Sequence, residues 1–299
     1  MSHLVTTSKY SRYFTTSDGV KLHYRESGEG EPVIMLTGWT GDTSVYHRNY
    51  PALSEHFKVY VLDYRFHGLS ESPDYGMHVT RLAADLHELI EHLGLNKVSL
   101  IAHSMGNAVI WAYIMLYGQN RIKKIVHEDE PPSLSANPAW TPEEDHQWTG
   151  GDQRDNNFWT LVNWLEDSWE TALGRFGEYF PPHAEVPEPP DYFYPEPDPI
   201  AINPFTMDKH KHAMLLADHM TNDWRDIIPT IKVPTLFIGG LASHCTTLES
   251  LDWMQSHVPG SKVVTFAPEE FGVHEMHLFN PEKFNKVVID FLLEKENAE

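Results

Sequence analysis

The five residues Ala102–Gly106 constrain the fold of this chain more than any other feature. They read Ala-His-Ser-Met-Gly and lie between an apolar run, residues 98–101, and a helix-like stretch, residues 107–117. A sharp turn from a strand into a helix exposes a serine on a strained backbone, and small flanking residues let strand and helix approach closely. Ala102 and Gly106 occupy those flanking positions. The pattern therefore predicts a strand-turn-helix unit that presents Ser104 as a nucleophile.

Strand and helix patterns alternate on both sides of this turn. Residues 20–26 alternate apolar and polar side chains, as an antiparallel edge strand does. Continuous apolar runs predict strands buried on both faces at 32–36, 58–63, 98–101, 124–128, 235–238 and 262–266. Helical apolar spacing or helix-forming composition predicts helices at 81–93, 107–117, about 248–258 and 281–293. The alternation predicts an α/β fold with a mostly parallel sheet.

The alternation stops between residues 133 and 229. This segment is acidic, has no clear strand pattern and contains six of the nine tryptophans. Its proline-rich part, 181–204, excludes a regular helix. We therefore expect a core domain formed by residues 1–132 and 230–299, with residues 133–229 inserted as a cap over the carboxyl ends of the strands.

Composition excludes several classes of partner. The formal charge of −21 argues against nucleic acid and anionic membranes. One cysteine excludes an internal disulfide, and the first ten residues lack the apolar stretch of a signal peptide. We expect a cytoplasmic protein that acts on a small molecule, without a cofactor. The oligomeric state is not indicated.

A serine hydroxyl needs a base within hydrogen-bonding distance, and the base needs an acid that orients it. His274 follows the last predicted strand and precedes Pro281, which can begin the terminal helix, so it is the candidate base. His277 is expected to be a packing residue or a residue at the entry to the terminal helix. The pair is one residue short of the zinc spacing H-E-x-x-H, and we expect no metal.

The candidate acid lies at the end of the strand at 124–128, because the strand at 235–238 is followed by no carboxylate. Side chains alternate along a strand, so Glu128 and Asp129 point to opposite faces unless the turn has begun. Asp129 is preferred and Glu128 is second. The oxyanion hole is expected from the backbone N–H groups of Trp39 and Met105. The side chains of Trp39, His103 and Glu128 are candidate pocket residues.

Taken together, residues 13–291 without the cap resemble the α/β-hydrolase superfamily. Residues 63–70 look like its D-x-R-G-x-G-x-S turn, with Phe66 in place of the first glycine, and Gly38-Trp39 matches its oxyanion loop. The resemblance implies an eight-stranded sheet with helices on both faces. It also implies a triad of Ser104, Asp129 and His274, although Leu241–Ser243 lack the acid found there in the commoner pattern.

The leading hypothesis is a serine hydrolase of the esterase or lactonase type, acting through an acyl-enzyme. The cap aromatics are compatible with a pocket for an apolar or aromatic substrate and equally with packing that holds the cap to the core domain. A cofactor-free dioxygenase acting on a heteroaromatic ring is the alternative, because the chain resembles such enzymes in Gly38-Trp39 and in His103 before Ser104. A ligand receptor without catalysis is a third hypothesis, and the complete Ser-Asp-His set argues against it.

Overall fold

The computed structural model describes residues 10–135, 137, 139–149, 168, 184–188 and 208–295. The strands are β1 Ser11–Thr15, β2 Lys21–Ser27, β3 Pro32–Leu36, β4 Lys58–Leu62, β5 Val98–His103, β6 Ile122–Glu128, β7 Thr235–Gly240 and β8 Lys262–Phe266. The α-helices are α1 Tyr50–Leu53, α2 Val79–His92, α3 Met105–Tyr117, α4 Pro142–Thr149, α7 Lys209–Met220, α8 Leu248–His257, α9 Met276–Phe279 and α10 Pro281–Leu293. Short 3-10 turns are η1 Thr43–Tyr46, η5 Ile228–Thr230 and η6 Pro268–Glu270.

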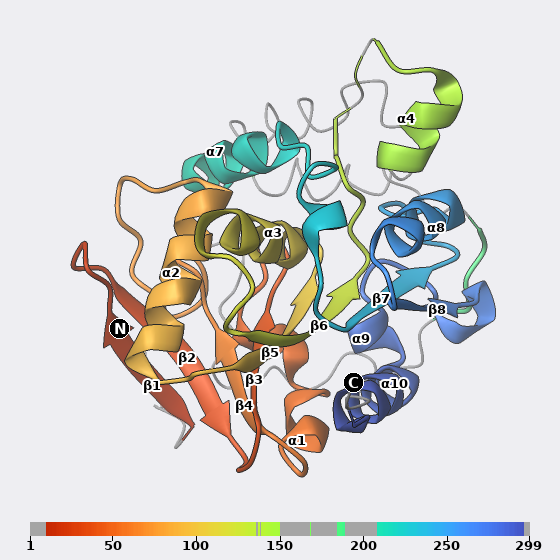
Figure 1. Ribbon diagram of the computed structural model, residues 1–299. Helices are drawn as coiled ribbons and strands as arrows, with labels where there is room; N and C mark the ends of the chain where they lie inside the picture. The colour runs from red at the N-terminus through yellow and green to blue at the C-terminus, as the bar shows by residue number, and fades with distance from the viewer. Residues whose placement is uncertain are drawn as a thin grey trace.

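The strands form one sheet in the order β1-β2-β4-β3-β5-β6-β7-β8 (Figure 1). From β4 to β8 every pairing is parallel, whereas β1 and β2 pair antiparallel at one edge. The predicted mostly parallel, eight-stranded sheet is confirmed. Strand β1 was not among the ranges expected from the apolar runs, because its short Ser11–Thr15 segment is mostly exposed or half-buried.

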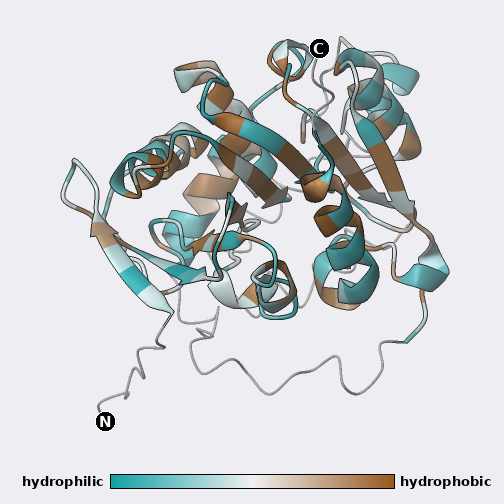
Figure 2. Cartoon of the chain, turned by 60° about the horizontal axis from the view of Figure 1, so that its bottom comes forward, coloured by the Kyte–Doolittle hydropathy of each residue, from teal (hydrophilic) through white to brown (hydrophobic). Residues whose placement is uncertain are grey.

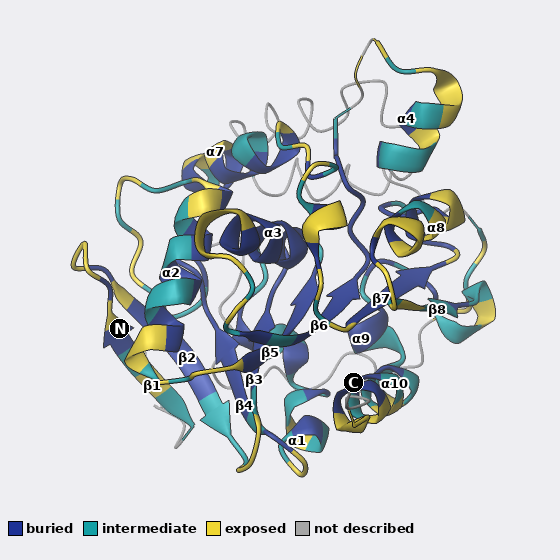
Figure 3. Ribbon diagram, in the orientation of Figure 1, coloured by how far each residue is buried: buried dark blue, intermediate teal, exposed yellow. Residues whose placement is uncertain are grey.

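Alternating side chains of the central strands enter two apolar layers. Ile34 and Leu36 pack with α2 and α3 on one face, whereas Val33 and Met35 pack with α10 on the other. Both layers are buried (Figure 3), and Figure 2 shows hydrophobic residues concentrated along the strands. The double burial explains why these strands have continuous apolar sequences rather than alternating ones.

Helix α3 lies unusually close to the sheet. A Cβ atom on Gly106 would lie 2.9 Å from the carbonyl oxygens of Leu36 and Thr37 on the neighbouring strand and its loop. Such a distance is shorter than van der Waals contact, so only glycine permits this approach. The close packing of α3 against the sheet therefore explains why a glycine stands two positions after Ser104.

The described part of residues 133–229 is mainly helical. It contains α4 and α7, and Figure 1 shows both beyond the carboxyl ends of the central strands. One isolated bridge, Ser133 to Asp223, is the single strand-like pairing within these described residues. The other residues of the proline-rich range lie outside the described ranges, apart from 184–188. No helix in the described ranges is long and apolar enough to span a bilayer.

Candidate active site

Ser104 stands at the turn between β5 and α3, as predicted. Its backbone has φ 52° and ψ −131°, a conformation that side-chain-bearing residues rarely adopt. The Ser104 N–H donates to the Glu128 carbonyl at 2.9 Å, which ties the turn to the end of β6. The strained backbone is held by this contact and by the tight packing of α3, and it directs the side chain into a cavity.

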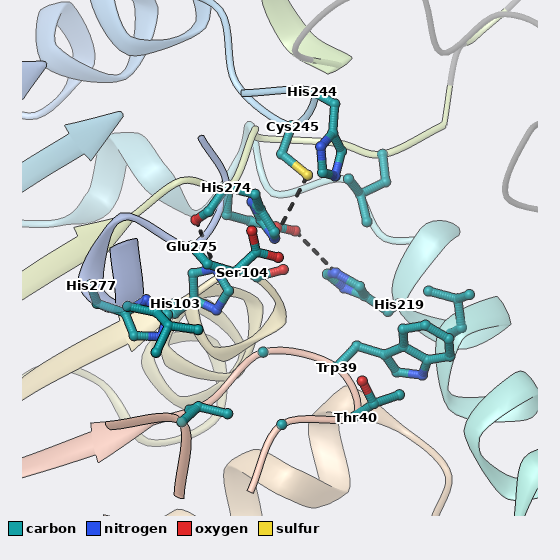
Figure 4. Close-up of a pocket in the computed structure, with 17 residues that line it drawn as sticks. Trp39, Thr40, His103, Ser104, His219, His244, Cys245, His274, Glu275 and His277 are labelled. Carbon is teal, nitrogen blue, oxygen red and sulfur yellow. Dashed lines mark hydrogen bonds and ion pairs between the residues drawn. The ribbon is translucent and has the colours of Figure 1, made fainter. Parts of the chain in front are cut away.

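His274 lies in the loop between η6 and α9, and it lines the same cavity as Ser104. Its Nδ1 is 2.7 Å from Oδ2 of Asp129. Its carbonyl accepts a hydrogen bond from Nε2 of His103 at 3.0 Å. The first contact orients the imidazole, and the second holds the backbone of the loop. Figure 4 shows Ser104 and His274, which are 170 positions apart in the sequence, on the wall of one cavity.

Asp129 has a left-handed backbone with φ 52°, so the turn has begun at this residue. Its carboxylate accepts hydrogen bonds from the Ser243 and Thr246 hydroxyls and from the Gly240 N–H at 3.2 Å. These donors lie at the end of β7 and in the loop after it, where no carboxylate was found in the sequence. The hydroxyl groups of that loop hold an acid that comes from β6. The sequence shows that this loop has no carboxylate, but it gives no sign that the loop donates hydrogen bonds to Asp129.

Glu128 points away from Asp129. Its Oε1 is 2.9 Å from the His277 N–H and 3.1 Å from His277 Nδ1, and the whole residue is buried. Glu128 is not among the cavity-lining residues, so the expectation that it lines the pocket needs correction. It is the last residue of β6, where alternation still holds and directs its side chain beneath the cavity. Its partner His277 lines the cavity and contacts the rings of Tyr46 and Phe284.

The cavity has a volume of about 430 Å³. Trp39 and His103 line it, together with apolar side chains from several elements: Val45, Leu134, Leu216 and Leu278. Glu130 and His219 also line it and form a buried ion pair of 3.0 Å. Figure 4 shows His219 reaching toward the centre of the site. The sequence offered no signal for this pair, because its partners are 89 positions apart, one in the segment after β6 and the other on α7.

The Gly38-Trp39 loop passes directly against the nucleophile turn. A Cβ atom on Gly38 would lie 3.0 Å from Ser104 Cβ and from His103 Nδ1. The Trp39 indole N–H donates to the His212 carbonyl at 3.0 Å, which anchors the loop to α7. Met105 is the first residue of α3, so its N–H has no partner within the helix. Met105 therefore directly follows Ser104 in the chain, and Trp39 follows Gly38, the residue that lies against Ser104.

Burial governs the ionisation of the site. Loss of hydration lowers the pKa of His274 to about 3, with a further contribution from the nearby His277 imidazole. The same cause lowers the pKa of His103 to about 3. Burial raises the pKa of Asp129, and it raises the pKa of Glu128 to about 8. At neutral pH His274 is therefore an uncharged imidazole, the form that can accept a proton.

Within the described residues, no hydrogen bond joins the Ser104 hydroxyl to His274. Nε2 of His274 instead faces Cys245 Sγ at 3.8 Å. Burial raises the pKa of Glu130, and a contact with the Ser104 hydroxyl offsets part of that rise. Two groups in the described ranges could hold a metal ion: His244, Cys245 and His274, and His103, Glu128 and His277.

Known proteins show the same architecture. A sequence model of the alpha/beta hydrolase fold matches residues 31–278. The chain belongs to this family. It is 33% identical over 117 residues to a soluble epoxide hydrolase from Corynebacterium sp. (strain C12), a match that spans 39% of this chain and 41% of that one. It is 24% identical over 286 residues to a non-heme chloroperoxidase from Kitasatospora aureofaciens, spanning 93% and 98% of the two chains.

Among solved structures, an esterase from Exiguobacterium antarcticum superimposes with a TM-score of 0.81 at 23% identity, covering 94% of this chain and 99% of that one. A bromoperoxidase from Bacillus anthracis gives a TM-score of 0.80 at 23% identity, covering 95% and 100%. Identity at this level establishes the shared fold and leaves the reaction to be argued from the site.

Proposed function

We propose that this α/β-hydrolase-fold protein is a serine hydrolase that cleaves a carboxylic ester or lactone, with Ser104 as nucleophile, His274 as base and Asp129 as the orienting acid. The observation that carries the proposal is the 2.7 Å contact between His274 Nδ1 and Asp129, with Ser104 on a strained turn in the same cavity. An acid on Nδ1 leaves Nε2 as the acceptor for the serine proton.

In the proposed reaction, Ser104 Oγ attacks the carbonyl carbon while its proton passes to His274 Nε2. The N–H groups of Trp39 and Met105 stabilise the negative oxygen of the tetrahedral intermediate. His274 then protonates the leaving alkoxide, and an acyl-enzyme remains. Water, deprotonated by His274, releases the carboxylic acid and regenerates Ser104.

The mechanism requires Ser104 Oγ to turn from the Glu130 side toward His274. Catalytic hydrogen bonds are often long before substrate binds and shorten in the complex. Rotation about one bond of the Ser104 side chain moves Oγ without moving the strained backbone. We expect a substrate carbonyl in the cavity to favour this rotamer.

The cavity composition supports an apolar acyl or alcohol group. Val45, Leu134 and Leu216 lie on its wall, and the indole of Trp39 adds an aromatic face. Leu216 and His219 come from α7, so we also propose that residues 133–229 act as the cap and contribute to substrate selection.

A fluorophosphonate probe tests the nucleophile. We expect one adduct by intact mass, mapped to Ser104, and none in Ser104→Ala. Ser256→Ala, an exposed serine on α8, is the matched control and should label like the parent protein. Labelling that persists in Ser104→Ala, together with unchanged turnover of short p-nitrophenyl esters and lactones, would contradict the proposal.

The cofactor-free dioxygenase is a second candidate because no hydrogen bond joins Ser104 to His274 among the described residues. In that reaction His274 deprotonates the substrate, and Ser104 is not required as a nucleophile. Oxygen uptake with a 3-hydroxy-4-quinolone that survives in Ser104→Ala but not in His274→Ala would favour this candidate.

A further inference from the structure

Cys245 is the one cysteine of the chain, and it lies beside the candidate base. Its Sγ is 3.8 Å from His274 Nε2, and the ring of His244 has its centre 5.1 Å from the His274 ring (Figure 4). The three ligand atoms of these side chains all lie within 4.8 Å of one another. All three residues line the cavity, so an ion can reach them through it.

We propose that His244, Cys245 and His274 form a Zn²⁺ site on the cavity wall, and that the bound ion competes with Ser104 for Nε2 of His274. One thiolate and two imidazoles match the preference of Zn²⁺ for sulfur and nitrogen ligands. The binding part of the proposal stands on these residues alone. The competition with Ser104 rests on the proposed hydrolase function.

The distances fit a tetrahedral ion after small side-chain movements. With Zn–S about 2.3 Å and Zn–N about 2.0 Å, sulfur and nitrogen ligands of a tetrahedral ion stand about 3.5 Å apart. The observed separation of Cys245 Sγ and His274 Nε2, 3.8 Å, is close to that value. His244 is half-buried, and its ligand nitrogen lies within 4.8 Å of the other two ligand atoms. The fourth position opens to the cavity, where water or a ligand oxygen can enter.

The surroundings of His274 are those of a zinc ligand. Its Nδ1 contacts the Asp129 carboxylate at 2.7 Å, and a histidine that binds zinc through one nitrogen usually donates the other N–H to a carboxylate. The Cys245 N–H donates to Ser243 Oγ at 3.0 Å, which fixes the thiol beside Asp129. Together the thiolate and the Asp129 carboxylate would balance the double charge of the ion.

The neighbouring group His103, Glu128 and His277 makes a weaker site. His277 Nδ1 is 3.1 Å from Glu128, and His103 Nε2 is occupied by the His274 carbonyl at 3.0 Å. A metal there would have to break these hydrogen bonds within the protein. In the proposed site, the contact that the metal replaces at Nε2 is the weak one to the Cys245 sulfur.

Cobalt titration of the reduced, chelator-treated full chain tests binding without using activity. One Co²⁺ per chain should produce a thiolate-to-cobalt charge-transfer band, and added Zn²⁺ should remove it. In Cys245→Ser the band should be lost, and zinc affinity by calorimetry should fall on the order of 100-fold. His244→Asn should weaken binding, whereas His56→Asn, an exposed histidine outside the site, should bind like the parent protein.

Two further measurements complete the test. Zinc should slow alkylation of the single thiol in the unmodified protein, which needs no variant. It should also inhibit ester turnover reversibly, and Cys245→Ser, normalised to its own zinc-free rate, should need more zinc for half-inhibition. Absence of the charge-transfer band, or no thiol protection by zinc, overturns the site. If binding is seen but no ester is turned over, the hydrolase function has failed and the metal site stands.

Discussion

Asp129→Asn separates the roles of two adjacent carboxylates. In the protein, the Gly240 N–H and the Thr246 hydroxyl reach Oδ1 of Asp129, whereas His274 Nδ1 and the Ser243 hydroxyl reach Oδ2. Hydroxyl groups can rotate and accept a hydrogen bond, but the Gly240 N–H can only donate. The asparagine must therefore keep its carbonyl oxygen toward Gly240 and turn its NH₂ group toward His274.

That orientation reverses the tautomer of His274. Nδ1 must then accept, so the proton moves to Nε2, the atom proposed to take the serine proton. An amide in place of the acid of a Ser-His-Asp triad costs about 10⁴ in kcat, and we expect a loss on the order of 10³ to 10⁴ here. At 1.36 kcal/mol per decade, the barrier rises by about 4 to 5.5 kcal/mol.

Glu128→Gln is the matched control, since it also replaces a buried carboxyl group by an amide, one position earlier at the end of β6. Glutamine keeps an oxygen that can accept from the His277 N–H, so kcat should change by less than about 10-fold. The assay is steady-state hydrolysis of p-nitrophenyl acetate, with urea unfolding to confirm that both variants are folded. If Asp129→Asn keeps a third of the activity, or Glu128→Gln loses as much as Asp129→Asn does, Asp129 is not the triad acid.

Three further predictions concern stability. Burial lowers the pKa of His127, which packs between Trp111 and Phe237, to about 3. As pH falls through about 6.5, the unfolded chain therefore binds a proton at this histidine and the folded chain does not, so acidification destabilises the fold. Between pH 7 and pH 5 this residue should lower the free energy of unfolding by about 2 kcal/mol. His127→Phe should lack that part of the loss when urea unfolding is compared at the two pH values, and an identical pH dependence would disprove it. Gly106→Ala should destabilise the fold by about 1 to 3 kcal/mol, because the new Cβ meets backbone oxygens at 2.9 Å; a midpoint equal to that of the parent protein would refute the close approach of α3. The buried Lys124 ammonium donates to the carbonyls of Phe291 and Leu292 and to that of residue 294 at the end of α10. Lys124→Met should cost about 2 to 3 kcal/mol in thermal or urea unfolding, and a cost under about 0.5 kcal/mol would show that these contacts contribute little.

The sequence alone was sufficient for the features that depend on local pattern. Continuous apolar runs identified β3 to β8 in the sheet because side chains on both faces of a central strand are buried. The small residues at Ala102 and Gly106 located the nucleophile turn, and the terminal helix was predicted at Pro281–Leu293, where the structure has it. Boundaries elsewhere differ by a residue or two, as for α2, which begins at Val79 rather than Arg81.

Contacts between distant segments were decided by the tertiary structure. The left-handed backbone at Asp129 ends the strand alternation after Glu128, which sends one carboxylate to His274 and the other to His277. The Glu130–His219 ion pair and the position of Cys245 beside His274 left no periodic trace in the sequence. Hydrophobic patterns repeat along one element and can be read from it, whereas these polar contacts form only where the sheet and α7 bring the carboxyl ends of separate segments together.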